Sequence, residues 1–171
     1  MWIYTGLERP PFAATPRPGQ ESVWDYPRPP KLVVDHRRIV VRQGDLLIAD
    51  SPETYRVLET AAPPTFYIPS RDTHVEVLKP FPGTSTCEWK GAAIYWALET
   101  PTPARTAIGW SYSTAQAPYG AISGYYSFYP GRVECYVDGE RVRPQPGYFY
   151  GGWITHEIIG PWKGEPGTES W

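Results

Sequence analysis

Proline is the feature of this sequence that most limits its possible folds. The chain contains 21 prolines among 171 residues, well above the usual share of ~5%. Because proline fixes φ and lacks an N–H donor, it interrupts helices and central strands. A helical bundle is therefore excluded, and short strands joined by fixed turns are expected. Eight tryptophans and thirteen tyrosines favour the same class, since aromatic residues prefer strands and line pockets.

Length and charge exclude several classes of protein. A chain of 171 residues with 41% hydrophobic residues fits one domain with a real core. The formal net charge is −2 and no basic run is present, so nucleic acid is a poor candidate partner. Met1–Thr5 lacks the regions of a signal peptide, and no apolar run approaches ~20 residues. We expect a cytoplasmic protein without a membrane partner, either monomeric or a weak homodimer.

The residues that commonly bind metals are dispersed. The two cysteines are Cys87 and Cys135, and the three histidines are His36, His74 and His156. They form no CxxC pair and no HxH or HxxxH motif, so a tetrahedral zinc site is not expected. We predict neither a metal nor a cofactor.

The chain divides into three parts by composition. Residues 1–30 form a proline-rich arm, residues 31–143 a core domain, and residues 144–171 an arm rich in glycine, proline and aromatic residues. Trp24 and Tyr26 are unusual for a solvated linker, which is normally poor in aromatic residues. We therefore expect both arms to dock on the core domain, although a flexible linker remains the alternative.

The core domain alternates short apolar segments with turn residues. Asp50–Glu53 has the pattern of a helix start, with Ser51 as cap and Pro52 at the first position, and a short helix is expected before Ala61. Residues 80–83 are expected to form a loop. Gly44, Pro130–Gly131 and Asp138–Gly139 are expected to form hairpin turns. The expected strands span 38–42, 45–49, 65–69, 74–78, 85–90, 92–99, 105–112, 125–129 and 133–137.

Several of these segments carry, in order, motifs of a known family. Together they resemble the bacterial family called domain of unknown function 427 over roughly residues 37–137. The stretches are Ile48-Ala49-Asp50-Ser51, Val57-Leu58-Glu59-Thr60 with Pro63-Pro64, Tyr67-Ile68-Pro69 with Arg71-Asp72, Thr86-Cys87 with Lys90-Gly91, Tyr95-Trp96, Trp110-Ser111-Tyr112 and Phe128-Tyr129-Pro130.

The resemblance implies a mainly β fold, an antiparallel β-tent in which two sheets lean together at one edge, with one short helix and the two arms. The drug-binding domain of cereblon and the methionine sulfoxide reductases share this fold. Many β-tents hold a zinc knuckle whose cysteines this chain lacks. The resemblance implies no activity. The paired carboxylates and phosphate-binding loop that a nucleotidyltransferase needs are also missing.

The stretch Thr86–Trp96 concentrates chemically active residues. Cys87 could be a nucleophile if Lys90 lowered its pKa, or a small buried apolar residue. Residues three apart on one strand point to opposite faces, so only a turn would bring these two together. Lys90 could bind a ligand, or pack its stem on aromatic rings and hold its head in solvent.

One aromatic pocket would unite the candidate residues. We predict that Tyr67, Arg71, Lys90, Tyr95, Trp110 and Tyr112 face one cavity, with Glu59 and Asp72 at its rim. Such a lining suits a small planar or anionic molecule, through cation–π contacts and charge-assisted hydrogen bonds. Two alternatives remain open. One is an enzyme acting on a small metabolite through Glu59, Arg71, Asp72, Cys87 or Lys90, and the other is a protein-interaction domain.

Overall fold

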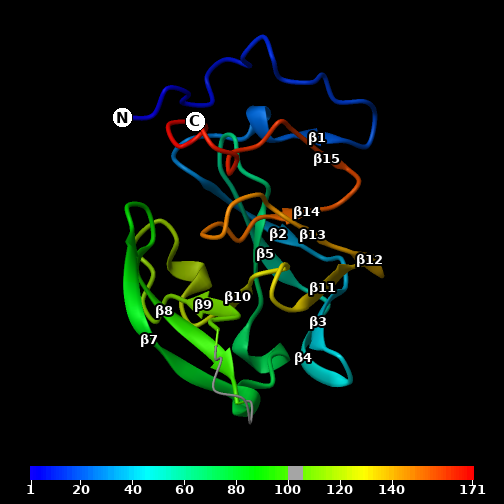
Figure 1. Cartoon of the computed structure of the whole chain (residues 1–171), viewed down its shortest axis with the longest axis vertical. Coiled ribbons are helices and arrows are strands. Elements are labelled where there is room, and N and C mark those ends of the chain that lie inside the picture. Colours follow the sequence, from blue (N-terminus) through cyan, green and yellow to red (C-terminus); the bar gives the residue numbers. More distant parts are fainter. Residues whose placement is uncertain (100–105) are drawn as a thin grey trace.

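The computed structural model describes residues 1–99 and 106–171, and its regular structure is almost entirely β (Figure 1). Helices in this part are three-residue 3-10 turns: η1 (Val23–Asp25), η2 (Ser70–Asp72), η3 (Val75–Val77) and η4 (Gly120–Ile122). None of them could cross a membrane. The strands are β1 (Glu21–Ser22), β2 (Lys31–Asp35), β3 (Ile39–Gln43), β4 (Leu46–Ser51), β5 (Thr54–Leu58), β6 (Thr65–Tyr67), β7 (Leu78–Cys87), β8 (Gly91–Leu98), β9 (Gly109–Ser111), β10 (Tyr126–Phe128), β11 (Glu134–Val137), β12 (Glu140–Arg141), β13 (Arg143–Pro144), β14 (Trp153–Ile154) and β15 (Ile158–Ile159).

Three sheets make up the body of the protein. Two of them have four strands, in the orders β10-β9-β8-β7 and β12-β11-β3-β4, and the third has the order β2-β5-β6. Their pairings are antiparallel. The expectation of a mainly β, antiparallel fold is therefore confirmed.

The main core fills the space between the sheets. An isolated bridge between Ile68 and Tyr126 joins the end of β6 to β10, so the sheets meet there. Phe66 stacks on Trp153 with ring centroids 4.7 Å apart. Trp153 also donates a hydrogen bond from Nε1 to the carbonyl of Phe128 at 2.9 Å. The indole N–H of this buried side chain is thus hydrogen-bonded, as buried polar groups usually are.

The prediction of a helix after Ser51 is wrong, because Thr54–Leu58 forms strand β5. The capping side chain does act locally: Ser51 Oγ accepts a hydrogen bond from the backbone N–H of Glu53 at 3.3 Å. It closes a turn between β4 and β5 instead of starting a helix. The segment then pairs with β2 on one side and β6 on the other. Long-range pairing therefore overrides a local capping signal.

Other boundaries also differ from those expected. The segment at 74–78 contains the 3-10 turn η3. The expected loop 80–83 lies inside β7, where a bulge interrupts the register between Phe81 and Thr84. The expected hairpin around Pro130–Gly131 is wrong, because β10 pairs with β9 whereas β11 pairs with β3 and β12. Of the strand expected at 105–112, Gly109–Ser111 forms β9, and Arg105 lies outside the described residues.

Several short turns follow expectation. Strands β3 and β4 form a hairpin around Gly44, which has a φ of 57°. Strands β11 and β12 pair around Asp138 and Gly139, whose φ angles of 46° and 83° suit a two-residue hairpin turn. Strands β7 and β8 pair so that Cys87 faces Gly91. A turn of three residues therefore separates these two strands.

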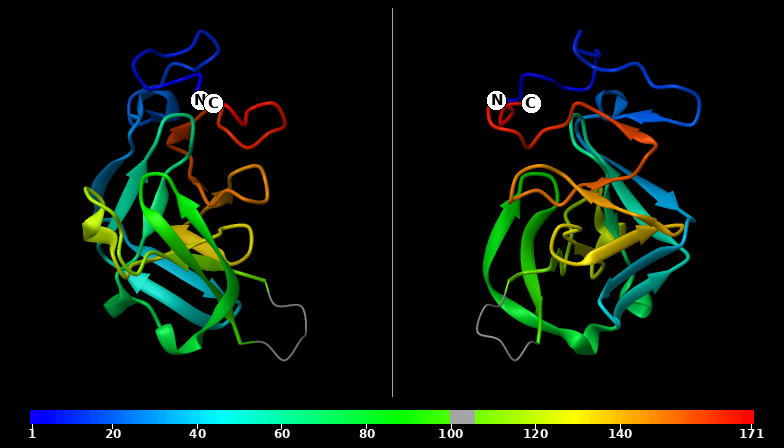
Figure 2. Two further views of the ribbon diagram at one scale, coloured as in Figure 1. Left: turned by 90° about the vertical axis from the view of Figure 1, so that its left-hand side faces the viewer. Right: turned by 45° about the vertical axis from the view of Figure 1, so that its right-hand side comes forward.

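The two arms lie beside each other at one end of the molecule (Figures 1 and 2). They pair directly, because β1 runs parallel to β15. Trp24 is fully buried there and donates from Nε1 to the carbonyl of Pro161 at 2.7 Å. Its ring contacts Trp171 at a centroid distance of 5.3 Å. The three-part division of the chain remains a prediction.

Candidate functional site

A cavity of about 450 Å³ lies where the arms meet the β7–β8 turn and the aromatic faces of the sheets. This volume is in the range of small-molecule sites. Side chains from β5 to β9 and from both arms line it. The residues are Trp2, Arg28, Val57, Glu59, Ala62, Pro63, Thr65, Tyr67, Ser85, Thr86, Cys87, Glu88, Trp89, Lys90, Ala93, Tyr95, Trp110, Tyr112, Tyr129, Gln145, Phe149, Tyr150, Gly151 and Lys163.

Aromatic side chains of neighbouring strands form the inner wall. Tyr95 and Trp110 are opposite each other in the β8–β9 pair, so their side chains share one face. Trp110 donates a hydrogen bond from Nε1 to the hydroxyl of Tyr67 at 3.1 Å. The ring of Tyr112 lies 6.3 Å from that of Tyr67. Each ring is thereby held in place, which gives a preformed wall.

Three hydroxyl groups on this wall, those of Tyr67, Tyr112 and Tyr129, remain protonated at neutral pH. Burial raises the pKa of Tyr67 and of Tyr112, because the charged phenolate is poorly solvated there. Burial likewise raises the pKa of Tyr129 to about 12. Tyr95 shares a hydrogen bond with Ser85 Oγ at 2.6 Å. The wall therefore offers neutral hydroxyl groups that can donate hydrogen bonds.

Lys90 supplies a positive charge to this wall. The residue is 7% exposed, and its Nζ atom lies 5.7 Å from the centre of the Tyr112 ring. Among residues 1–99 and 106–171, no carboxylate lies within 4.0 Å of this atom. Burial alone would lower its pKa, but interactions with Tyr67, Cys87 and Glu59 outweigh burial and raise it. Lys90 is therefore a buried ammonium without a direct counter-ion.

Local backbone geometry places Lys90 there. The turn between β7 and β8 ends at Gly91, whose φ of 95° strongly favours glycine. The carbonyl of Lys90 accepts a hydrogen bond from the N–H of Gln116 at 3.1 Å. The same turn brings Cys87 near the Lys90 side chain, so that the thiol acts on the pKa of Lys90. Sequence spacing alone left that contact undecided.

The arms form the opposite side of the cavity. Arg28, whose side chain is 4% exposed, pairs with Glu59 at 3.2 Å. Its guanidinium group lies 4.3 Å from the centre of the Trp2 ring. Lys163 contacts the same ring at 3.9 Å. Trp2 in turn donates from Nε1 to Glu88 at 3.0 Å. One indole ring thus links both arms to the β7–β8 turn.

The cavity brings together most of the predicted site residues. Seven of them line it: Glu59, Tyr67, Cys87, Lys90, Tyr95, Trp110 and Tyr112. Ligand binding by these residues remains a prediction. Arg71 and Asp72 are not among the lining residues. Arg71 lies in η2 with its side chain 64% exposed, and Asp72 accepts a hydrogen bond from Ser51 Oγ at 2.7 Å. The expectation that these two share the cavity is wrong, because the chain enters a 3-10 turn after Pro69 that is occupied by local contacts.

Sequence reasoning missed the lining residues of the arms. Trp2, Arg28, Gln145, Tyr150 and Lys163 come from segments without hydrophobic periodicity. The aromatic content of the arms indicated docking but not where they dock. Gln145 illustrates the difficulty. Its side-chain Nε2 donates a hydrogen bond to the carbonyl of Lys163 at 2.7 Å, and its Oε1 accepts one from the N–H of Gly152 at 3.1 Å. Such contacts between loops leave no pattern in the sequence.

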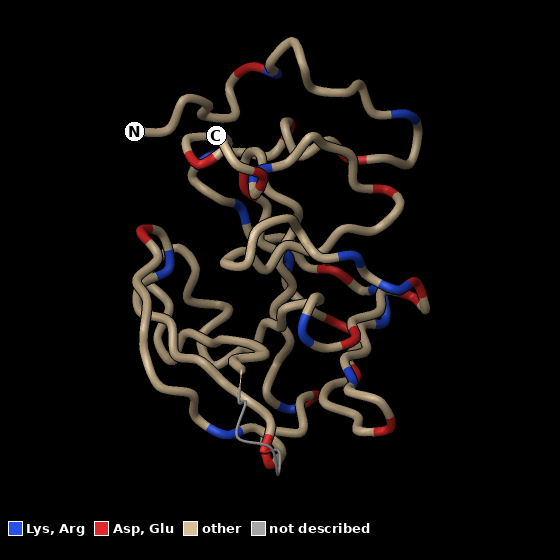
Figure 3. Tube along the Cα trace, in the orientation of Figure 1, with Lys and Arg blue, Asp and Glu red and all other residues tan. Residues whose placement is uncertain are grey.

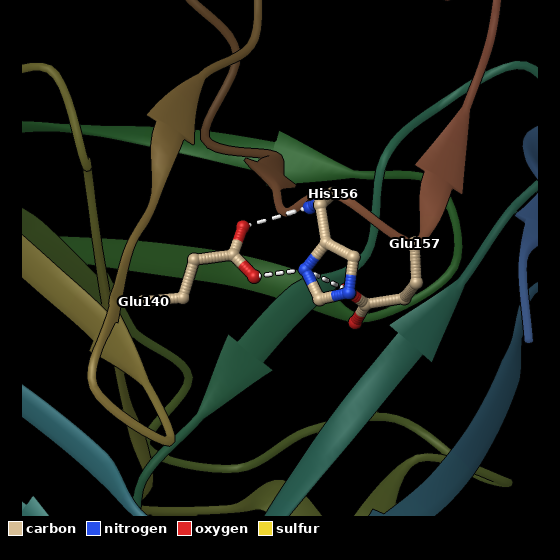
Figure 4. Close-up of side chains that lie close together, drawn as sticks. All are labelled: Glu140, His156 and Glu157. Carbon is tan, nitrogen blue, oxygen red and sulfur yellow. Dashed lines mark hydrogen bonds and ion pairs between the residues drawn. The ribbon is translucent and has the colours of Figure 1, made fainter.

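A second polar cluster lies outside the cavity lining and consists of Glu140, His156 and Glu157 (Figure 4). Their ligand atoms lie within 4.8 Å of one another. However, Arg37 already pairs with Glu157, and His156 is 84% exposed. Hydrogen bonding to Glu140 raises the pKa of His156, which disfavours the neutral imidazole that a metal needs. We interpret this cluster as a surface ion pair, and the absence of a metal remains a prediction.

Comparisons with known proteins identify the family of this chain. A search of curated proteins finds no match for this chain. A family model described as "Domain of unknown function (DUF427)" matches residues 31–139. The matched part includes the β7–β8 turn with Lys90 and the aromatic wall, whereas Arg28 and Lys163 lie outside it. The chain therefore belongs to the DUF427 family.

Proposed function

We propose that this protein binds a small planar anion in the aromatic cavity. The observation that carries the proposal is Lys90, a buried ammonium without a carboxylate within 4.0 Å in the described part of the chain. A buried charge is costly unless it is paired. A ligand carboxylate or phosphate would supply the missing partner, while the rings of Tyr67, Trp110 and Tyr112 offer flat apolar surface.

The protonation of Lys90 favours binding over covalent chemistry. Its raised pKa keeps the amine protonated at neutral pH, and an ammonium is not a nucleophile. The same charge attracts an anion through charge-assisted hydrogen bonds. A role for Lys90 as an anion anchor is thus better supported than the enzyme alternative.

The remaining features are consistent with a small-molecule partner. Figure 3 shows basic and acidic residues interspersed along the trace, which gives no reason to expect nucleic acid as a partner. We also propose the β-tent arrangement for the sheets. The bridge between Ile68 and Tyr126, which joins two sheets near one edge, supports it.

A thermal-shift titration with benzoate tests the proposal. Binding at about ten times its Kd stabilises the folded state by about 1.4 kcal/mol, which raises Tm by roughly 3 °C or more. Lys90→Met removes the charge and should abolish the shift. Lys79→Met is the matched control, because Lys79 is half-exposed, pairs with Glu99 at 3.4 Å and does not line the cavity. Equal shifts in both variants would refute the role of Lys90.

A further inference from the structure

Cys87 is a free thiol in the wall of the cavity. It ends β7, is half-buried and lines the cavity, where it packs against the aromatic cluster that contains Tyr67 and Tyr112. Cys135, the other cysteine of the sequence, is free and fully buried in the main core. The two thiols belong to different clusters of the fold. Oxidation of Cys87 to a disulfide therefore needs a thiol from outside the chain.

The turn that follows Cys87 carries two buried groups that an anion would satisfy. Lys90 is buried and has no carboxylate within 4.0 Å among the residues that the structure describes. Trp89 also lines the cavity, and its Nε1 atom is buried without a hydrogen-bond partner in the same part of the chain. Buried donors normally have an acceptor. Both groups therefore favour a negatively charged acceptor next to the thiol.

The carboxylates that line the cavity are engaged elsewhere. Glu59 accepts a hydrogen bond from Arg28 at 3.2 Å, and Glu88 accepts one from Trp2 Nε1 at 3.0 Å. The charge of Glu59 acts on Lys90, but from more than 4.0 Å away. Lys90 therefore retains the capacity to bind a carboxylate that enters from solvent.

We propose that Cys87 is a covalent modification site, at which a small disulfide with a carboxylate close to its sulfur atoms forms a mixed disulfide while Lys90 holds the carboxylate. This inference rests on the role of Lys90 in the proposed function and adds a reaction at Cys87. The turn brings the thiol and the ammonium close together. The carboxylate must therefore lie only a few bonds from the sulfur that is attacked, as in short thiol acids.

The reaction is a thiol–disulfide exchange. Cys87, as the thiolate, attacks one sulfur of the small disulfide and forms a new S–S bond, while its proton passes to solvent. The original S–S bond breaks, and its electron pair leaves with the second sulfur as a small thiolate. The small disulfide is thus the oxidant, because one of its halves is released as a reduced thiol. Binding of the carboxylate at Lys90 holds the reacting sulfurs together, which raises the rate.

Exchange rates with a matched pair of disulfides test the proposal. Dithiodiglycolate carries two carboxylates, and dithiodiglycolamide has amides of similar size in their place. Mass spectrometry of the intact protein measures adduct formation at pH 8 and low ionic strength, and each rate is divided by that of free N-acetylcysteine. We expect this normalised rate to be roughly tenfold or more higher for the dicarboxylate, the factor typical of one charge-assisted hydrogen bond. Peptide mapping should place the adduct on Cys87, and Cys87→Ser should abolish it.

Two lysine variants identify the source of this preference. Lys90→Met should lower the ratio of the two normalised rates to about one, because the carboxylate is no longer recognised. A general change in thiol reactivity cancels in this ratio. Lys79→Met should leave the ratio unchanged, since Lys79 is half-exposed and does not line the cavity. An unchanged ratio in Lys90→Met would refute the role assigned to Lys90.

The outcomes separate this inference from the proposed function, which the benzoate titration tests by itself. If benzoate binds through Lys90 but the two normalised rates of the unaltered protein are equal, the modification site is refuted and the proposed function stands. If the ratio is high but benzoate does not bind, the planar-anion proposal fails and the site at Cys87 stands. Should Lys90→Met fold poorly, the ratio in the unaltered protein still decides, because equal rates refute the site and a tenfold preference supports it.

Discussion

The backbone at Gly151 lies directly against the indole ring of Trp110. A Cβ atom at position 151 would be 2.2 Å from Cη2 of that ring. The C-terminal arm therefore closes against the aromatic wall at a point where no side chain fits. This contact joins an arm outside the region matched by the family model to a residue inside it.

Replacing Gly151 with alanine should destabilise the protein and disturb the cavity. The added methyl group must displace either the Trp110 ring or the arm, which costs about 1–3 kcal/mol. Urea unfolding followed by tryptophan fluorescence measures the change. Gly120→Ala is the control, because no atom lies within 4 Å of a Cβ atom placed there. It should shift stability by less than about 0.5 kcal/mol, and equal losses in both variants would contradict the packing argument.

Two arginine pairs of the N-terminal arm should differ in their contribution to stability. Arg28 is buried and also bonds two backbone carbonyls, so Arg28→Met should cost about 3 kcal/mol by leaving Glu59 and those carbonyls unpaired. Arg9 pairs with Asp25 at the surface, where the side chains are 35% and 45% exposed. Arg9→Met should cost less than about 1 kcal/mol. Chemical denaturation of both variants checks the difference, and similar losses would contradict it.

Trp24 should be the main anchor of the N-terminal arm. Its ring meets Tyr4 and Phe12 edge-on at 5.1 Å each, and the side chain is fully buried. Trp24→Ala should cost about 3–5 kcal/mol, equivalent to a Tm lower by roughly 10 °C. Deleting residues 1–30 should lower Tm at least as much. Differential scanning calorimetry measures both, and an unchanged Tm after deletion would show that the arm is a free linker.

Acid should destabilise the protein through a buried ion cluster around Asp35. Burial favours the neutral acid, but hydrogen bonds from Arg37 outweigh it and lower the pKa of Asp35 below 3.8. Arg56 Nε, which makes no hydrogen bond with good geometry, lies 3.1 Å from this carboxylate and adds to the attraction. Burial also favours the neutral form of Glu21 and Glu157, but hydrogen bonds from Arg56 and Tyr26 lower the pKa of Glu21, and those from Thr155 and Arg37 lower the pKa of Glu157.

The direction of the pH effect follows from these shifts. A carboxyl group with a lowered pKa in the folded state contributes stability above its unfolded pKa of about 4, and that stability is lost as pH falls through the folded value. The free energy of unfolding should therefore decline below about pH 4. Asp35→Asn should be less stable at pH 7 and decline less steeply in acid. If the free energy of unfolding of the variant fell as steeply below pH 4 as that of the unaltered protein, Asp35 would not contribute to the acid sensitivity.

The two cysteines should differ sharply in their reactivity. Cys135 is fully buried in the core, and burial raises the pKa of its thiol. Cys87 is half-buried and lines the cavity. Iodoacetamide at pH 8 should alkylate Cys87 in the folded protein and Cys135 at least ~100-fold more slowly, because Cys135 must await unfolding. Peptide mass spectrometry distinguishes them, and equal rates without denaturant would contradict the structure.

Local patterns predicted the parts of the fold that depend on neighbouring residues. Gly44 and the Asp138–Gly139 pair lie at hairpin turns because their φ angles are set within the turn itself. The same patterns failed at Thr54–Leu58, where a cap at Ser51 suggested a helix. Both edges of that segment are paired with strands, and such pairing depends on residues far away in the sequence.

The candidate site shows the same division between local and distant information. Trp110 and Tyr112, which both line the cavity, could be placed on one face because strand alternation is a local property. The sequence could not assign Arg28 and Lys163 to the cavity. Both contact the ring of Trp2, but Lys163 belongs to the C-terminal arm and Trp2 to the N-terminal arm. Arg71 was expected in the cavity because it and Tyr67 flank the rigid Ile68-Pro69 step. The chain enters the 3-10 turn η2 between these two residues, so Arg71 does not line the cavity although it is only four residues from Tyr67.

The sequence by itself determined that this chain is a mainly β protein with aromatic strands around Lys90. Proline density, strand alternation and turn residues act over a few residues and need no knowledge of the rest of the chain. Only the tertiary structure decided that two arms, separated by more than a hundred residues, pair through β1 and β15. That pairing places Lys163 and Arg28 across the cavity from the aromatic wall, because burial of Trp24 and the close approach of Gly151 to Trp110 hold both arms against the same surface.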